Sequence, residues 1–127
     1  MAENNDLGNW GEQIACEFLQ KKGFIIMDRN WRYGRSHRDL DIVCKTPDQR
    51  TYVFVEVKTR SSDTMVLPQE AVDRKKIHFL ATAAGHYVVS NGIVEDLRFD
   101  IIGVVGTPSS KNVKIEHIEN AFNPLLL

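Results

Sequence analysis

The side chains best suited to chemistry stand in a stretch that otherwise has the composition of a buried strand. Residues 52–58 are mostly β-branched or aromatic, contain no Gly or Pro, and include Glu56 and Lys58; this pattern predicts a β-strand. Alternation places Glu56 and Lys58 on one face. A carboxylate beside core residues is costly unless it is compensated. Either the two side chains form a half-solvated ion pair, or the acid holds a metal ion.

A second acid is expected to lie close to Glu56. Residues 39–44 are typical of a strand, and a turn at 47–50 joins it to residues 52–58 as a hairpin. This pairing sets Asp41 beside Glu56. Alternation puts three apolar residues of the first strand on the opposite face: Leu40, Ile42 and Cys44.

Two carboxylates and a lysine on a rigid sheet suggest phosphate chemistry. Carboxylate oxygens suit Mg²⁺ or Mn²⁺, which keep waters and accept a substrate phosphate. Such an ion polarises the phosphate and activates a bound water. Lys58 can position or deprotonate the attacking water, or stabilise developing negative charge. The alternative for Asp41, Glu56 and Lys58 is a surface ion-pair cluster, which contributes only about 0–1 kcal/mol.

At these residues the sequence resembles the PD-(D/E)XK nuclease superfamily, in which an Asp is followed on the next strand by Glu-x-Lys. Here these are Asp41 and residues 56–58. The resemblance is closer to the small bacterial YraN-like proteins, which are similar to archaeal Holliday junction resolvases. It covers roughly residues 7–105, and the matching positions are 8–12, 15, 19, 23–24, 30–32, 41, 53–60, 72, 76 and 98–100.

The resemblance implies an α/β fold with a restriction-endonuclease-like core, in which helices flank a central mixed β-sheet. It implies Asp41 and Glu56 as metal ligands, joined by the Val57 carbonyl, with Lys58 as the catalytic lysine and Mg²⁺ (or Mn²⁺) as cofactor. Glu12 of the first helix would lean toward the metal. Its alternative is an acid of the first helical turn that interacts with the helix dipole. One departure is Arg38-Asp39, where the family has Gly-Glu.

A basic segment follows the first helix and can contact nucleic acid. Trp31 and Tyr33 stand between its arginines and can stack on bases. The candidate nucleic-acid-binding residues are Arg29, Arg32, Arg35, Arg38, Arg60 and Lys76. In the alternative, Trp31 belongs to the core and the arginines pair with acids; both interpretations remain open.

Length and composition limit the number of domains, the kind of surface and the cellular location. At 127 residues, without a linker or repeat, the chain is expected to be one nuclease-like domain with its core at about 7–118. A net charge of −1 argues against a surface coated with DNA-binding charge, though not against a local basic face. Cys16 and Cys44 lack metal-site spacing and predict buried free thiols. The polar N-terminus and the absence of long apolar runs favour a cytoplasmic protein that uses neither a membrane nor a small-molecule cofactor.

Further elements complete the expected sheet. A first helix should run from about Leu7 to Lys22, capped by Asn5 or Asp6 and ended by Gly23. A second helix should begin at Pro68, reach about Val89 and be ended by Asn91-Gly92. Residues 97–105 predict a central strand and residues 111–117 a more exposed one. Within the central strand, Asp100 is best explained as a partner for an arginine. The four histidines show no ligand spacing.

Three functions from different classes follow. The first is a metal-dependent DNA endonuclease acting on branched or structured DNA, with a homodimer implied by the resemblance to resolvases. The second is a nucleic-acid-binding module that keeps the fold but does not cut. The third is an interaction protein without nucleic-acid function, which uses the sheet or the apolar tail at residues 125–127.

Overall fold

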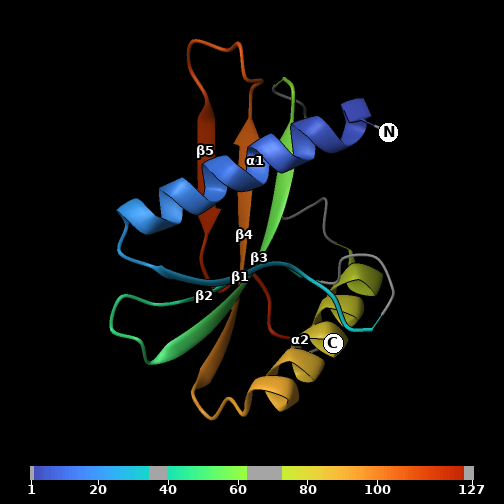
Figure 1. The fold of residues 1–127 in the computed structure, drawn as a ribbon, viewed down its shortest axis with the longest axis vertical. Helices are drawn as coiled ribbons and strands as arrows, with labels where there is room; N and C mark the ends of the chain where they lie inside the picture. Colours follow the sequence, from blue (N-terminus) through green and yellow to red (C-terminus); the bar gives the residue numbers. More distant parts are fainter. Residues whose placement is uncertain (1, 35–39, 63–72, 125–127) are drawn as a thin grey trace.

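A mixed sheet with one helix on each face forms the fold (Figure 1). The computed structural model describes residues 2–34, 40–62 and 73–124. In chain order the elements are α1 (Ala2–Lys21), β1 (Ile25–Trp31), β2 (Leu40–Lys45), β3 (Thr51–Arg60), α2 (Arg74–Asn91), β4 (Asp96–Val105) and β5 (Lys114–Ile118). The five strands lie in sequence order; β3 and β4 are parallel and the other neighbours antiparallel. The predicted α/β class and mixed sheet are confirmed.

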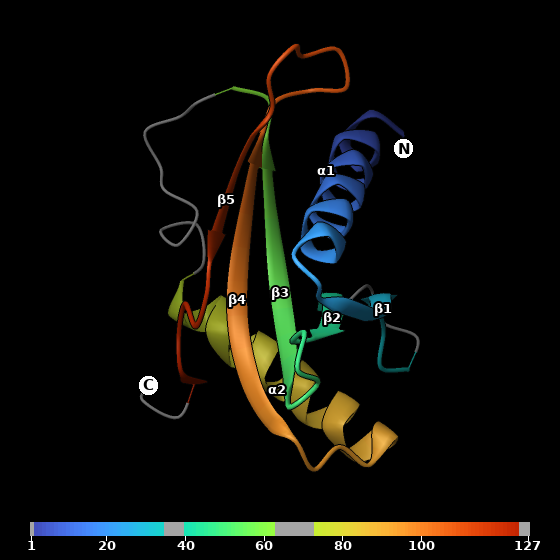
Figure 2. The ribbon, with the colours of Figure 1, turned by 90° about the vertical axis from the view of Figure 1, so that its left-hand side faces the viewer.

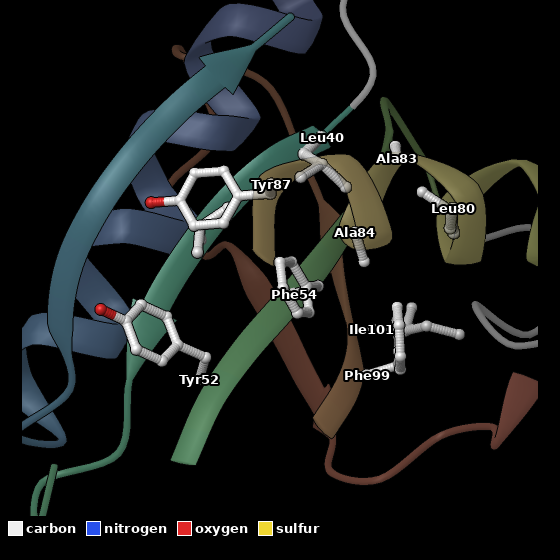
Figure 3. Packing of buried hydrophobic residues seen from close by; sticks show 10 residues of the cluster. Leu40, Tyr52, Phe54, Leu80, Ala83, Ala84, Tyr87, Phe99 and Ile101 are labelled. Carbon is white, nitrogen blue, oxygen red and sulfur yellow. The ribbon is translucent and has the colours of Figure 1, made fainter. Parts of the chain in front are cut away.

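Each face of the sheet carries its own apolar core. Against α1 pack the side chains of Val53 and Val55 (Figure 2 shows α1 beside β3 and β4). Against α2 packs Phe54, between those two valines, together with Ile101 of β4 (Figure 3). The alternation predicted for β3 is therefore confirmed, and it places Glu56 on the face that α2 covers.

Leu40 does not follow the alternation predicted for β2. Ile42 and Cys44 belong to the core under α1 as expected, but Leu40 belongs to the core under α2 (Figure 3). The β2–β3 ladder begins only at Ile42, opposite Val55. At Leu40 the strand is still paired with β1, opposite Trp31, and both side chains pack on the core under α2.

Helix α1 begins earlier than predicted and ends where predicted. It starts at Ala2, so Asn5 and Asp6 lie inside the helix and do not cap it. Gly23 follows its end with a φ of 92°, a conformation that favours glycine. The N–H of Phe24 donates to the carbonyl of Leu19 over 3.0 Å, which closes the helix in a Schellman-type end.

Helix α2 begins later than predicted, because Asp73 is its N-cap. The carboxylate of Asp73 accepts from the backbone N–H of Lys76 over 2.9 Å, which satisfies a free donor of the first turn. Pro68, the predicted start, lies outside the described residues. The predicted end is confirmed, since Gly92 caps α2 in the left-handed conformation.

The cysteines and the helices are the subject of two further predictions, on free thiols and on membrane-spanning segments. Cys16 and Cys44 are buried free thiols, as predicted, and burial raises the pKa of Cys44 to about 12. Neither α1 nor α2, the helices found in residues 2–34, 40–62 and 73–124, is long and apolar enough to cross a membrane.

A candidate metal centre between β2 and β3

Asp41 and Glu56 meet where the β2–β3 ladder ends. The last ladder pair is Ile42 with Val55. Beyond it, Oδ2 of Asp41 accepts a hydrogen bond from the backbone N–H of Val57 over 3.0 Å. A side-chain hydrogen bond also joins Asp41 to Glu56. The hairpin thus brings the two carboxyl groups together as the sequence predicts.

Glu56 is buried, and its titration reflects this. Only 6% of its side chain is exposed. Burial and then the negative charge of Asp41 raise the pKa of Glu56 to about 7, against the opposing effect of Lys76 and Lys58. A bound cation would relieve the electrostatic repulsion between two carboxyl groups held this close together.

Two lysines approach the same oxygen of Glu56. Nζ of Lys58 lies 3.4 Å from Oε2, and Nζ of Lys76 lies 3.5 Å from it. Lys58 comes from the same face of β3, whereas Lys76 comes from the first turn of α2. Both side chains remain partly exposed, at 28% and 36%. The site is therefore open to solvent on its cationic side.

The donor set fits an ion that keeps most of its waters. Mg²⁺ is usually bound through one or two carboxylates together with substrate phosphates, and Asp41 and Glu56 supply two. Within residues 2–34, 40–62 and 73–124, no group of three or more His, Cys, Asp or Glu side chains could hold a metal. The chemistry of the two carboxyl groups suits Mg²⁺ or Mn²⁺ with water and phosphate as the remaining ligands. The described residues do not include enough acidic, His or Cys side chains at this place to bind a metal by themselves.

The structure decides one of the two interpretations of Glu12. It lies in the middle of α1, so the first-turn interpretation is wrong. It is 5% exposed. The neighbouring Gly11 packs so closely on Thr59 that an added Cβ would overlap the threonine side chain. Helix α1 therefore passes close to the same end of β3 as Lys58, next to Glu12, on the opposite face of the sheet.

The predicted nucleic-acid-binding residues do not form one group. Arg29 donates to Gln13 of α1 over 2.8 Å, so it lies on the α1 side of β1. Arg32 is exposed just after β1, and Arg60 is half-buried at the end of β3. Arg35 and Arg38 lie outside the described residues. Among the four described members of this set, only Lys76 forms an ion pair with Glu56.

The aromatic residues of the basic segment separate into two roles. Trp31 packs against the core under α2, edge-on to Tyr87 with ring centroids 5.2 Å apart. The core interpretation of Trp31 is therefore right. Tyr33 is exposed and stacks on His86 of α2, with centroids 3.9 Å apart. Neither ring stands free above the carboxylate pair.

A second polar cluster lies at the other side of β4. Arg98 donates two hydrogen bonds of 2.9 Å to Asp100, which confirms the predicted arginine partner. Nε2 of His117 lies 2.7 Å from the same carboxylate, and Asn120 donates its backbone N–H. Sequence reasoning missed His117. The sequence offers one weak indication of its role. His117 lies two residues after Ile115, on the strand face where an apolar residue would be expected.

The comparisons with known proteins agree with the sequence resemblance. The model of the uncharacterised protein family UPF0102 matches residues 11–104. A UPF0102 protein of Flavobacterium psychrophilum is 45% identical over 96% of this chain and 98% of its own. One of Porphyromonas gingivalis is 46% identical over 100% and 90%. Among solved structures, Hjc of Archaeoglobus fulgidus, a Holliday junction resolvase, is 20% identical over 92% of both chains, with a TM-score of 0.45. The chain belongs to the UPF0102 family, the YraN family that its sequence resembles.

Proposed function

We propose that this protein is a metal-dependent DNA endonuclease that hydrolyses phosphodiesters in branched or structured DNA. The observation that carries the proposal is the buried carboxyl group of Glu56 paired with the partly buried Asp41, with Nζ of Lys58 at 3.4 Å from Glu56. The same three residues match the Asp and Glu-x-Lys core that the sequence resembles. The geometry supports this function because an ion-pair cluster needs no second acid hydrogen-bonded to the first.

Asp41 and Glu56 would hold Mg²⁺ or Mn²⁺, which supplies phosphate polarisation and a water of lowered pKa. The Val57 N–H fixes one oxygen of Asp41, so that carboxylate is already oriented. In the reaction, a water oxygen forms a bond to phosphorus while the bond to the leaving oxygen breaks. Lys58 orients that water and donates a hydrogen bond to the developing negative charge. Glu12 would support the site from α1.

The DNA backbone would be held by the basic side chains around this centre. Arg32 and Arg60 are available at the ends of β1 and β3. Arg35 and Arg38 are proposed as further contacts on the strength of the sequence. Arg29, whose guanidinium is bound to Gln13, would contribute through the local charge of the surface. Such contacts position the duplex without reading its sequence.

One observation favours a second candidate, a DNA-binding module with the same fold that does not cut. When both acids are ionised, Lys58 and Lys76 together balance the charges of Asp41 and Glu56, so the cluster is then neutral without a metal. This candidate predicts DNA affinity that falls with salt, and no cleavage products with any metal ion.

Calorimetric titration of Mg²⁺ and Mn²⁺ into wild type, Glu56→Gln and Glu116→Gln separates these functions. Glu116 is an exposed acid of β5 and provides the matched control. Each protein is then incubated with a four-way DNA junction and a linear duplex. The endonuclease predicts metal binding and cleavage by wild type and Glu116→Gln only, with a preference for the junction. Cleavage by Glu56→Gln at the wild-type rate would refute the assignment.

A homodimer and a cytoplasmic location stay predictions, the first drawn from the resemblance to resolvases. A four-way junction presents two equivalent strands, so paired cuts call for two active sites. Sedimentation velocity with and without junction DNA measures the assembly. If the chain shows no salt-dependent DNA affinity at all, the third function, protein interaction alone, replaces both nucleic-acid functions.

A further inference from the structure

The feature that the proposed chemistry leaves unexplained is the second lysine on Glu56. Catalysis at a carboxylate pair needs one lysine near the phosphate, and Lys58 serves this purpose. Yet Nζ of Lys76 lies as close to Oε2 of Glu56 as Nζ of Lys58 does, at 3.5 Å against 3.4 Å. The two ammonium groups come from different elements and converge on a single oxygen.

The charges of the site disfavour the contact of both lysines with Glu56 once a divalent cation is bound. Asp41 and Glu56 carry at most two negative charges, and the two lysines already balance them. A divalent ion would raise the net charge of the cluster to plus two. Oε2 of Glu56, the oxygen that both lysines contact, is one of the atoms offered to the metal. Like charges at such distances repel strongly in a partly buried place.

Lys76 is the side chain that can leave. Lys58 lies two residues beyond Glu56 on the same strand face, so the pleat holds it close. Lys76 belongs to α2 and is the more exposed of the two, at 36%. Its ammonium lies 5.4 Å from the ring centroid of Phe79, and its backbone N–H is held by the Asp73 cap. A change of its side-chain rotamers would therefore release Glu56 without disturbing α2.

The surroundings of Lys76 favour an anion once Glu56 is released. The first turn of α2 contains Arg74, Lys75 and Lys76 and no acid. The positive end of the helix dipole adds to this charge. A phosphate is the chemical group that such a concentration of positive charge beside a metal-bound carboxylate pair would accept.

Resting on the proposed function, we propose that Lys76 holds Glu56 in the metal-free protein and is displaced by the incoming divalent cation, which frees its ammonium to bind a phosphate of the DNA. Lys76 is on this account a positioning residue that couples metal binding to substrate binding. Without metal, Lys76 compensates the charge of the buried Glu56. With metal bound, Lys76 contacts a phosphate of the DNA instead.

The test compares Lys76→Met with Lys75→Met. Both substitutions remove one positive charge from the same helical turn and keep an unbranched side chain, but Lys75 is exposed and is not the lysine paired with Glu56. Mg²⁺ is titrated calorimetrically at pH 9, well above the pKa of about 7 of Glu56, so that protons compete little. Lys76→Met should bind Mg²⁺ more tightly than Lys75→Met, on the order of tenfold, since an adjacent charge alters such equilibria by that much or more.

A second readout follows Lys76 itself in wild type. Acylation by an N-hydroxysuccinimide ester is measured at Lys76 and Lys75 by mass spectrometry, with and without Mg²⁺. Displacement predicts that Mg²⁺ raises the rate at Lys76 relative to Lys75. An unchanged ratio of rates would contradict displacement.

The outcomes distinguish this inference from the function on which it rests. Equal Mg²⁺ affinity in the two variants overturns the role of Lys76 and leaves the metal site standing. No Mg²⁺ binding by wild type or either variant overturns the metal site and the inference together. Tighter binding by Lys76→Met alone supports both.

Discussion

The backbone N–H of Val57 donates to Oδ2 of Asp41 across 3.0 Å, in the place where a ladder hydrogen bond would otherwise join β2 and β3. The side chain of Asp41 thereby replaces the backbone of β2 as the partner of β3. The β2–β3 ladder ends at this point, and Glu56, the residue before Val57, projects toward the face that α2 covers. The candidate site is thus built into the end of a hairpin and does not depend on a separate loop.

The titration of Glu56 depends on Asp41. In Asp41→Asn the amide oxygen can still accept from Val57, but the negative charge is lost. Since that charge and the shared hydrogen bond raise the pKa of Glu56, we expect the pKa to fall below its value of about 7. Carboxyl-carbon NMR measures it directly. Asp48→Asn, in the exposed β2–β3 turn, should leave the pKa of Glu56 unchanged.

Stability should fall as pH rises through neutrality because of Glu56. The pKa of Glu56 is about 7 in the folded state against an ordinary 4.5, so the folded state binds the proton of Glu56 more tightly than the unfolded state does. The resulting stabilisation is fully present below about pH 4.5 and is lost as the pH rises through 7. The whole change is on the order of 3 kcal/mol. Urea unfolding between pH 4.5 and 8 should show this loss in wild type relative to Glu56→Gln. Parallel stability profiles for the two proteins would contradict the raised pKa.

Asp100 should be among the most sensitive positions for stability. It is fully buried and accepts hydrogen bonds from Arg98 and the Asn120 N–H, with His117 also in contact. Asp100→Asn removes the buried counter-charge of Arg98 and leaves only the exposed Glu119, 4.0 Å away; breaking a buried pair costs about 3–5 kcal/mol. Asp96→Asn, at the exposed start of the same strand, should cost little. Denaturant midpoints of the two variants make the comparison, and equal midpoints would rule out the buried network as a source of stability.

Two glycines of α1 should respond to the same substitution with opposite signs. A Cβ at Gly11 would overlap the side chain of Thr59, whereas one at Gly8 would meet no atom within 4 Å. Gly8→Ala should therefore stabilise by up to about 1 kcal/mol through helix propensity. Gly11→Ala should destabilise by about 1–3 kcal/mol through overpacking. Thermal unfolding measures both, and stabilisation by Gly11→Ala would show that α1 does not sit against β3 as described.

Removal of Lys58 should separate binding from catalysis. Lys58→Met keeps the carboxyl pair and removes one ammonium from Glu56, so Mg²⁺ affinity should not decrease. The cleavage rate under single-turnover conditions should fall by about 10²- to 10⁴-fold, the usual contribution of proton transfer or charge stabilisation. Cleavage that survives this substitution would assign the water-orienting role to another residue.

Local signals were sufficient to predict much of the fold. The alternating valines of β3 show their pattern in the sequence because a pleated strand has a period of two. Gly23 and Gly92 end the helices as predicted, since the left-handed conformation favours glycine. The approach of Asp41 to Glu56 follows from a short hairpin, whose register the turn limits.

What the sequence did not show depends on contacts between distant elements. Leu40 packs under α2 together with Trp31, its partner in the β1–β2 register. His117 meets Asp100 only through the β4–β5 register. The contact of Lys76 with Glu56 requires the position of α2 over the sheet. The start of α2 was misplaced because Pro68 favours a helix start, whereas the carboxylate of Asp73 accepts from the N–H of Lys76 and caps α2 there.

The single parallel pairing in the sheet of the described residues has a consequence for the order of folding. Strands β1, β2 and β3 follow one another as antiparallel neighbours, so their contacts are local in sequence. Strand β4 pairs with β3 only after the chain has passed through α2, and closing that longer loop is entropically slower. Asp41 and Glu56 would therefore come together early, before α2 and Lys76 can compensate them. During synthesis on the ribosome, the nascent chain would carry an assembled carboxylate pair before the rest of the fold exists.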